Sequence, residues 1–351
     1  MKMQALVASG PNVFGMAEIE VPSPGPDEVL CRIRSVALCG SDPGLLAGNL
    51  VKRGWPPVYP FVFGHEWAGE VVETGSRVQG FSVNDRVAGE PHCGCGVCTN
   101  CRTGNYNLCL KYGVTESGHR HYGFLNNGAF AQYGVFRQNT LHHIPDGVSF
   151  DEATLCDAAG VALHGLRMVS IAPPCTVAIY GPGPIGCLAA QIAKANGAKI
   201  IMVGRGARLQ KALEAGADEG IDYEVYDDPA AEIIERTDGF GADVVVESSG
   251  TSKGLYQGIP SAARNGHVVL LGYYKDEEPV ILINLLHVRQ LHLHGSRANP
   301  NCADDVLKLI RQKAIHPGKL ITHTYHLAEF NTALQTFTQK ERGALKVVLH
   351  P

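Results

Sequence analysis

The sequence has few aromatic and few charged residues, and these low contents argue against several classes of protein. Aromatic residues make up only 7% of its 351 residues, charged residues 18%, and the net charge is −4. Without a basic excess or an aromatic stacking platform, the sequence predicts no nucleic-acid binding. No apolar run approaches about 18 residues, so we expect no membrane-spanning helix. The first residues show no apolar signal core, and we therefore expect a cytoplasmic protein.

Disulfides are a poor explanation for the eleven cysteines of such a protein, because a reducing compartment keeps thiols free. Four of the cysteines form a regular C-x2-C-x2-C-x7-C series in a glycine-rich stretch: Cys95, Cys98, Cys101 and Cys109. Four thiolates this close in sequence suit the tetrahedral coordination of a structural zinc ion. Cys93 lies outside this spacing and is interpreted as a spare thiol.

The hydrophobic pattern changes near residue 151. Before it, short strand-like segments such as Lys2–Ala8 are separated by turns rich in proline and glycine. After it, short apolar segments alternate with helical ones, which indicates βαβ units and a parallel sheet. We therefore predict an α/β protein. A β-rich domain covers residues 1–150, a doubly wound domain covers 151–296, and periodicity alone does not assign residues 297–351.

A glycine-rich turn predicts a dinucleotide site. Residues 181–186 read G-x-G-x-x-G, follow an apolar strand-like segment and open a helical stretch. Gly181 allows a tight turn, Gly183 lets the backbone approach a pyrophosphate, and Gly186 lets the helix pack on the strand. Pro184 and Ile185 complete the fingerprint where helix N–H groups face the phosphates. The alternative is an ordinary βα turn.

The end of the next predicted strand favours NADP over NAD. NAD sites place an Asp or Glu there, roughly 20 residues after the glycines, to bind the ribose hydroxyls. No acidic residue lies between positions 199 and 213. Gly204 leaves room, and Arg205 or Arg208 offers positive charge to a 2′-phosphate. Solvated arginines with no such role are the alternative.

A second set of metal-binding residue types is dispersed along the chain. Cys39 and Ser41 lie close together, His65 and Glu66 are adjacent, and Asp157 is distant. Cysteines are often inert core residues, and a single histidine is more often hydrogen-bonded than bound to a metal. Spacing alone therefore does not identify a site.

In combination, these motifs resemble the zinc-dependent medium-chain dehydrogenases/reductases, near the sorbitol, threonine and secondary-alcohol dehydrogenases. The similarity runs in order through residues 39–42, 64–66, the four-cysteine loop, 181–186 and 343–346. The resemblance implies a GroES-like catalytic domain that an inserted Rossmann domain splits, so that residues 297–351 return to the first domain. It also implies hydride transfer between a nicotinamide cofactor and a secondary alcohol or ketone.

The resemblance implies a role for each dispersed residue and two zinc ions per chain. Cys39 and His65 would bind the catalytic zinc. Glu66 and Asp157 would supply the remaining ligands or hold the zinc-bound water, and relatives differ on which one binds directly. Ser41 would contact the substrate oxygen and accept its proton.

Other positions resemble or depart from the pattern of the relatives. Lys346 resembles a contact to the cofactor pyrophosphate. Gly44 stands where many relatives carry a relay histidine, so the proton route is open. Asn84 replaces the glycine of a Gly-Asp-Arg-Val turn, which we expect to survive because Asn tolerates the left-handed conformation.

Two acidic residues beside a zinc ion suit a substrate that carries several hydroxyl groups. We therefore expect a polyol, cyclitol or sugar-derived alcohol as substrate, and an amino-cyclitol is also compatible. The expected assembly is a homodimer or homotetramer. One alternative is a non-catalytic regulatory or storage protein that binds zinc and NAD(P) on the same scaffold. A zinc-free enone reductase ranks lower, because such enzymes lack the four-cysteine loop and the pair Cys39 and His65.

Overall fold

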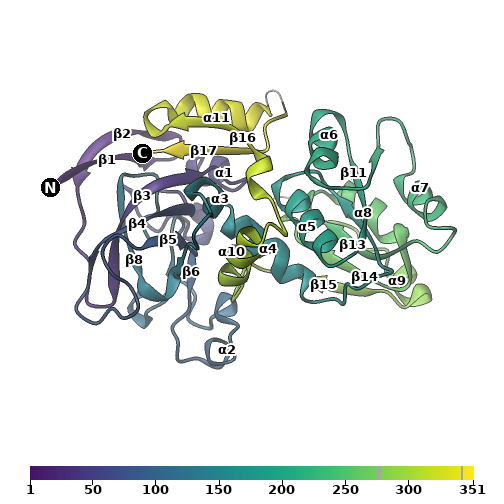
Figure 1. Cartoon of the computed structure of the whole chain (residues 1–351), viewed down its shortest axis with the longest axis horizontal. Helices are drawn as coiled ribbons and strands as arrows, with labels where there is room; N and C mark the ends of the chain where they lie inside the picture. The colour runs from purple at the N-terminus through teal and green to yellow at the C-terminus, as the bar shows by residue number, and fades with distance from the viewer. Residues whose placement is uncertain (275–277, 341–342) are drawn as a thin grey trace. The chain divides into compact units, whose positions relative to one another are not determined.

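The computed structural model describes residues 1–274, 278–340 and 343–351. The chain divides into two compact units (Figure 1). The first unit contains Met1–Asp157, Ala303–Arg311 and Ile321–Pro351, and the second contains Ala158–Cys302 and Gln312–Leu320. The segment predicted as 297–351 is therefore shared, because Gln312–Leu320 belongs to the second unit.

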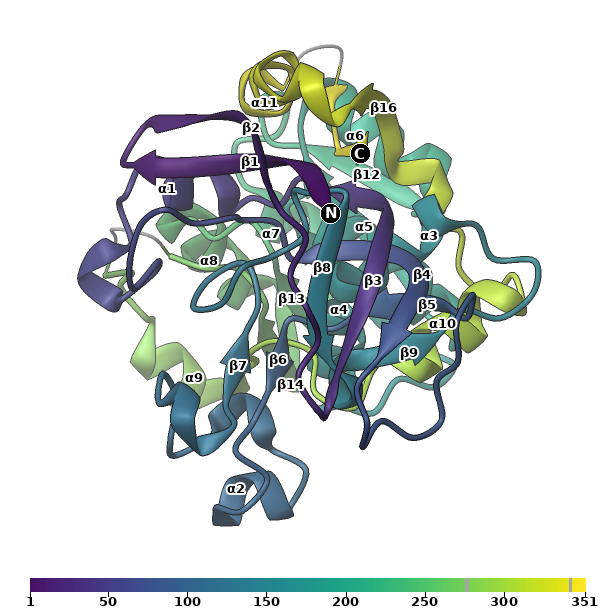
Figure 2. The same cartoon turned by 90° about the vertical axis from the view of Figure 1, so that its left-hand side faces the viewer.

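A mostly antiparallel sheet is the framework of the first unit (Figure 2). Its strands follow the order β16-β17-β3-β4-β5-β9, with β8 paired to β3, and the pairs β1–β2 and β6–β7 are separate. The strands are β1 (Lys2–Gly10), β2 (Val13–Glu20), β3 (Glu28–Ala37), β4 (Glu66–Thr74), β5 (Arg86–Gly89), β6 (His92–Cys93), β7 (Arg120–His121), β8 (Tyr133–Arg137), β9 (Leu141–His143), β16 (Ile321–His326) and β17 (Lys346–His350).

Large aromatic side chains fill the core of this unit. Phe63, Trp67 and Phe130 are almost completely buried, and the Phe136 ring stacks on Trp67 at 4.1 Å between centroids. The helices that join this sheet are α1 (Asp42–Leu46), α2 (Thr99–Arg102), α3 (Phe150–Thr154), α10 (Ala303–Arg311) and α11 (Phe330–Gln339). Helix α4 (Cys156–Leu166) begins in the first unit and continues in the second.

A six-stranded parallel sheet forms the second unit. Its order is β12-β11-β10-β13-β14-β15, the arrangement of the doubly wound dinucleotide-binding fold. The strands are β10 (Thr176–Tyr180), β11 (Lys199–Gly204), β12 (Glu219–Asp222), β13 (Ala242–Glu247), β14 (Ala262–Leu270) and β15 (His292–Gly295). The predicted fold class is confirmed.

Helices cover both faces of the parallel sheet. Helices α5 (Pro184–Ala195) and α6 (Gly206–Ala215) contact each other, as do α7 (Pro229–Glu235) and α8 (Ser252–Gly258), and α9 (Ile283–Arg289) packs near β14. Gly197 follows the end of helix α5 and adopts a φ of 87°, a conformation that favours glycine after a helix. Among the described residues, no helix is long and apolar enough to cross a membrane.

Short 3-10 helices and turns connect these elements. The predicted turn at Asn84 is confirmed, since this residue has a φ of 74° and its N–H donates to the Val71 carbonyl at 2.9 Å. The 3-10 helices are η1 (Val51–Arg53), η2 (Tyr106–Leu108), η3 (Thr115–Ser117), η4 (Gln138–Thr140), η5 (Ile259–Ser261), η6 (Pro317–Leu320) and η7 (Leu327–Glu329).

Candidate metal and cofactor sites

Three neighbouring strands of the first unit bring the dispersed residues together. Ala37 at the end of β3 pairs with Glu66 at the start of β4, and with Val348 of β17 on its other side. Cys39 is the second residue after β3, His65 directly precedes β4, and Lys346 begins β17. Residues far apart in sequence thus meet because three strand ends lie side by side.

Cys39, His65 and Glu66 form one group of possible metal ligands. One ligand atom from each lies within 4.8 Å of the others, and His65 and Glu66 are buried. Asp157 is also buried but lies outside this group. Asp157 nevertheless interacts electrostatically with His65 and Glu66, so both carboxylates stay candidate ligands, with Glu66 inside the 4.8 Å group. Ser41 Oγ is buried, with no hydrogen-bond partner among the described residues.

Asp42 is part of this site, although sequence reasoning gave it no role. Its Oδ2 accepts a hydrogen bond of 2.7 Å from the Cys39 backbone N–H, and its Oδ1 lies 3.7 Å from His65 Nδ1. A carboxylate that orients a metal-binding histidine is a common outer partner of such ligands. Its position three residues after Cys39, where it closes a local turn, was the available signal.

The charges around the group favour a cation. Burial raises the pKa of Asp42 to about 6 and that of Asp157 to about 7, because desolvation disfavours carboxylates. Burial opposes protonation of His65, but Cys39, Asp42 and Asp157 outweigh it and raise its pKa to about 10. The acidic side chains Asp42, Glu66 and Asp157 together with the Cys39 thiol exceed the basic groups His65 and Lys346 in number, and a divalent ion fits this donor set.

Lys346 lies at this site rather than at an open cofactor surface. Its ammonium forms a buried ion pair with Glu66 and donates to the Leu38 carbonyl at 3.2 Å. Burial lowers the pKa of Lys346, but Glu66 and Cys39 outweigh burial and keep the pKa above its ordinary value. The predicted contact to a pyrophosphate would require this ammonium to leave both partners.

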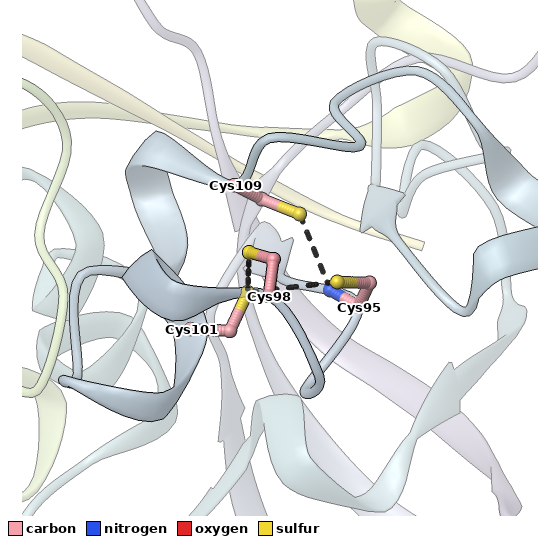
Figure 3. Close-up of side chains that lie close together, drawn as sticks. All are labelled: Cys95, Cys98, Cys101 and Cys109. Atoms are coloured by element: carbon pink, nitrogen blue, oxygen red, sulfur yellow. Dashed lines mark hydrogen bonds between the residues drawn. The ribbon is translucent and has the colours of Figure 1, made fainter.

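The four-cysteine loop forms the second candidate metal site, and its side chains turn toward one another (Figure 3). Cys98 Sγ lies 3.4 Å from Cys101 Sγ, and Cys109 Sγ accepts from the Cys95 backbone N–H at 3.4 Å. Backbone N–H groups of Cys101 and Leu110 lower the pKa of Cys98 to about 6. A thiolate at neutral pH is the form that zinc requires.

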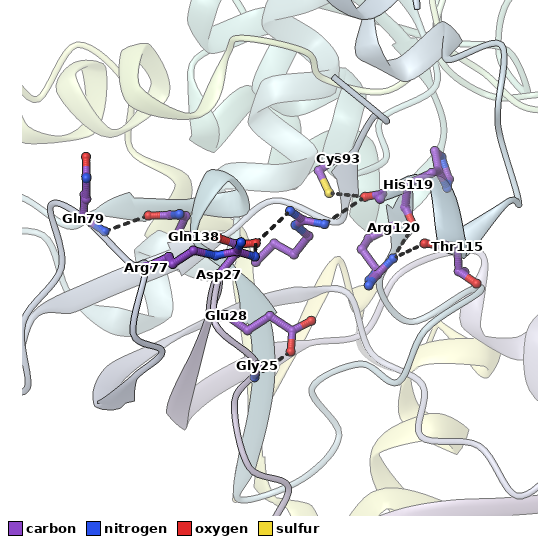
Figure 4. A network of polar contacts seen from close by, with 12 residues as sticks. Gly25, Asp27, Glu28, Arg77, Gln79, Cys93, Thr115, His119, Arg120 and Gln138 are labelled. Atoms are coloured by element: carbon purple, nitrogen blue, oxygen red, sulfur yellow. Dashed lines mark hydrogen bonds and ion pairs between the residues drawn. The ribbon is translucent and has the colours of Figure 1, made fainter. Parts of the chain in front are cut away.

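Cys93 lies outside that loop site, as predicted. Its buried thiol donates to the Gly118 carbonyl at 3.6 Å, at one end of a polar network (Figure 4). In the same network Arg120 donates to the Thr115 carbonyl at 2.7 Å, which ties the segment after the loop together. All eleven cysteines are free thiols.

The glycine-rich turn of the second unit has the geometry of a phosphate-binding loop. Gly181 has a φ of 107°, and a Cβ there would lie 2.7 Å from the Ser249 backbone nitrogen. A Cβ on Gly186 would lie 2.1 Å from the Gly181 oxygen, so both positions require glycine. A Cβ on Gly183 would meet nothing within 4 Å, and Pro184 begins helix α5 there. Its N-terminus is therefore accessible to a pyrophosphate.

The end of β11 carries no acidic residue, but Glu224, just after the next strand β12, lies beside Arg205. Arg205 forms an ion pair with Glu224, and its guanidinium lies 5.8 Å from the Tyr223 ring centroid. Lys253 Nζ lies 5.4 Å from the same ring. Arg208 is half-buried on α6, and burial lowers its pKa. Sequence reasoning missed these neighbours because β12 was not predicted.

The structure shows a packing reason for glycine at position 204 that the sequence did not reveal. A Cβ at this position would lie 2.4 Å from Cγ of the Pro182 ring. The glycine therefore lets β11 approach the turn before α5, besides any room it leaves for a phosphate. Substitution of Gly204 would disturb that turn and cannot test cofactor choice cleanly.

Comparison with known proteins decides the family. Residues 25–146 match the alcohol dehydrogenase GroES-like domain, and residues 184–312 match the zinc-binding dehydrogenase family. This chain belongs to the zinc-dependent medium-chain dehydrogenases/reductases. It is 35% identical to a sorbitol dehydrogenase of Halalkalibacterium halodurans, over 99% of each chain. It is 33% identical to an L-threonine 3-dehydrogenase of Pyrococcus horikoshii, over 92% of each chain.

Two solved structures of dehydrogenases share this fold over their whole length. A zinc-binding dehydrogenase of Sinorhizobium meliloti 1021 bound to NADP superimposes with a TM-score of 0.90, at 30% identity and complete coverage of both chains. A dehydrogenase of Escherichia coli CFT073 complexed with NADH gives 0.90 at 27% identity, covering 100% of this chain and 99% of that one. The chain is thus a zinc-dependent dehydrogenase that uses a nicotinamide cofactor.

Proposed function

We propose that this dehydrogenase interconverts a polyol, cyclitol or sugar-derived secondary alcohol and the corresponding ketone. The observation that carries the proposal is the convergence of Cys39, His65 and Glu66 in a buried, carboxylate-rich site. Similarity to a sorbitol dehydrogenase supports a substrate with several hydroxyl groups. Cys39, His65 and Glu66 would hold the catalytic zinc, which when bound polarises the substrate oxygen.

The residues around the ligands orient the site and handle the proton. Asp42 fixes the Cys39 backbone and faces His65, while Lys346 holds one oxygen of Glu66. Oxidation of an alcohol transfers a hydride to the nicotinamide and releases the hydroxyl proton. Ser41 Oγ has no hydrogen-bond partner within the described part of the chain, and we assign it as the first acceptor of that proton.

The four-cysteine loop would hold a second zinc ion with a structural role. Four sulfur ligands from one loop leave no open coordination position for a substrate, which is the arrangement of structural zinc. The thiol chemistry of both sites supports a reducing, cytoplasmic setting. For assembly, the exposed apolar residues Ile283 and Val288 on α9 support a homodimer or homotetramer.

For the cofactor we propose a preference for NADP, with Arg205 as the contact to the 2′-phosphate and Arg208 as the fallback. Similarity to an NADP-bound structure supports this preference. Glu224 opposes it, because its carboxylate pairs with Arg205 and would repel the phosphate.

Two substitutions with opposite expected effects test this cofactor assignment. Arg205→Ala should raise KM for NADPH about 10-fold or more, the loss expected for one charge-assisted contact. Glu224→Gln should lower KM for NADPH, because it releases Arg205 and removes a negative charge. Steady-state kinetics with NADH should change little in either variant. Equal changes with both cofactors, or a wild-type preference for NADH, would contradict the assignment.

The substrate proposal is tested by kcat/KM over a panel of alcohols and ketones with both cofactors, followed through the absorbance of the reduced nicotinamide. We expect polyols or cyclitols to exceed simple secondary alcohols of equal carbon number. A preference for the simple alcohols would contradict the substrate class. Turnover of no compound in the panel would favour the non-catalytic alternative.

A further inference from the structure

Three histidines lie together on the parallel sheet of the second unit, whereas both cysteine-containing sites belong to the first unit. His267 of β14 is in register with His292 of the edge strand β15, and His294 is two residues further along that strand. Side chains alternate across a strand, so His292 and His294 share one face of the sheet. Val268 and Leu293 belong to or pack against the apolar cluster of the opposite face, so all three histidines point away from it.

Two of the imidazoles already present nitrogens at the separation that a metal ion requires. His267 Nδ1 lies 3.0 Å from His294 Nε2. Zinc binds histidine nitrogen at about 2.0–2.1 Å, so two nitrogens on one ion lie about 3 Å apart. The pair is partly accessible to solvent, which gives an ion a path to it.

A hydrogen bond fixes the tautomer of the third imidazole, that of His292, and leaves one ring nitrogen with a lone pair for a metal ion. His292 Nε2 lies 3.2 Å from Asn265 Oδ1, and the Gln290 side-chain amide donates to the same oxygen at 3.0 Å. Asn265 Oδ1 is therefore an acceptor, and His292 Nε2 carries the proton, so Nδ1 keeps its lone pair. An outer hydrogen bond of this kind orients most metal-binding histidines.

The surroundings of His267 and His294 favour the neutral imidazole. Burial, followed by mutual repulsion, lowers the pKa of His267 and of His294. The His292 ring lies 4.8 Å from the His267 ring and 6.5 Å from the His294 ring, between centroids, so the exposed His292 side chain must turn toward the other two to complete the set. Two histidines two residues apart on one strand and a third on its neighbour can bind one ion from one side.

We propose that His267, His292 and His294 form a third divalent-metal site, which takes a transition-metal ion with a preference for imidazole nitrogen, such as Ni²⁺, Cu²⁺ or Zn²⁺. Nitrogen-rich donor sets suit these ions, whereas Mg²⁺ and Ca²⁺ prefer oxygen. The site uses no residue of the catalytic or structural zinc sites. It pins the edge strand β15 to β14, so the bound ion stabilises this side of the sheet.

Calorimetric titration of the untagged, zinc-loaded full chain with Ni²⁺ tests the proposal. The wild type should bind one Ni²⁺ per chain at micromolar concentration, without release of zinc, and its Tm should rise with Ni²⁺. His267→Gln and His294→Gln should each weaken this binding about 10-fold or more and abolish the rise in Tm, with turnover unchanged. His287→Gln, which changes an exposed histidine of the same unit, should bind Ni²⁺ as the wild type does.

Three results would overturn the third site. They are no Ni²⁺ binding at micromolar concentration, release of one zinc for each Ni²⁺ bound, and equal binding by the His267, His294 and His287 variants. Circular dichroism and zinc content establish that each variant is folded. Since none of these readouts depends on substrate turnover, the result is independent of the proposed function.

Discussion

At the scale of single residues, the pair formed by Lys346 and Glu66 controls the charge of the catalytic site. Both side chains are buried, and a carboxylate oxygen of Glu66 also lies within 4.8 Å of the possible ligand atoms of Cys39 and His65. A buried charge without its partner costs several kcal/mol, so neither residue can be removed alone at low cost. Lys346 therefore supplies the cation that pairs with the Glu66 carboxylate, and a carboxylate is the form that a metal ion binds.

In the zinc-free protein, Lys346→Met should destabilise the fold by about 3–5 kcal/mol, because it leaves the Glu66 carboxylate buried without a cation. The free energy of unfolding in urea measures this. Lys308→Met is the matched control, since Lys308 forms an exposed pair with Asp305 and should cost less than about 1 kcal/mol. Equal losses in the two variants would contradict the role given to Lys346.

The same variant separates a structural role from the pyrophosphate contact predicted from sequence. If Lys346 served mainly the cofactor, Lys346→Met would raise KM for the cofactor and leave stability nearly unchanged. We expect the reverse, together with weaker zinc retention. Adding Glu66→Gln should recover part of the lost stability, because the unpaired charge is then gone.

At the scale of elements, a chain of polar contacts ties the four-cysteine loop to helix α10. Tyr106 of the loop donates to Glu90 at 2.7 Å, His142 Nε2 lies 3.4 Å from Glu90, and His142 Nδ1 lies 2.9 Å from Asp304 of α10. Burial works against protonation of His142, but its two carboxylate partners outweigh it and raise its pKa to about 9. The charged form of His142 thus stabilises the folded chain.

His142→Gln should show a pH-dependent loss of stability. A pKa raised from 6.5 to about 9 means that the contribution is complete below pH 6.5 and disappears as pH rises through 9. The unfolding free energy should fall by about 2–3 kcal/mol at pH 6 and by much less at pH 10. His143→Gln changes the exposed neighbouring histidine and should cost less stability at pH 6 than His142→Gln does. A loss that is constant between pH 6 and 10 would contradict this account.

At the scale of the whole molecule, local patterns predicted more than long-range pairing did. The turn 181–186, helix α5 and the four-cysteine loop are contiguous in sequence, so spacing alone located them. The dispersed ligands needed the family resemblance. Strand β2, which is mostly exposed, and strand β12, which brings Glu224 to Arg205, were missed. The position of Lys346 depends on β17 lying beside β3, which no local pattern reveals.

Zinc content measured together with turnover tests the central claim, that Cys39, His65 and Glu66 hold the catalytic metal, most directly. Cys39→Ser should lose about one zinc per chain and nearly all turnover, while cofactor binding and fold persist, because the loop site is intact. Cys98→Ser, the matched control, should also lose about one zinc and some stability, yet its folded fraction should retain turnover. Near-normal kcat in Cys39→Ser would contradict the claim.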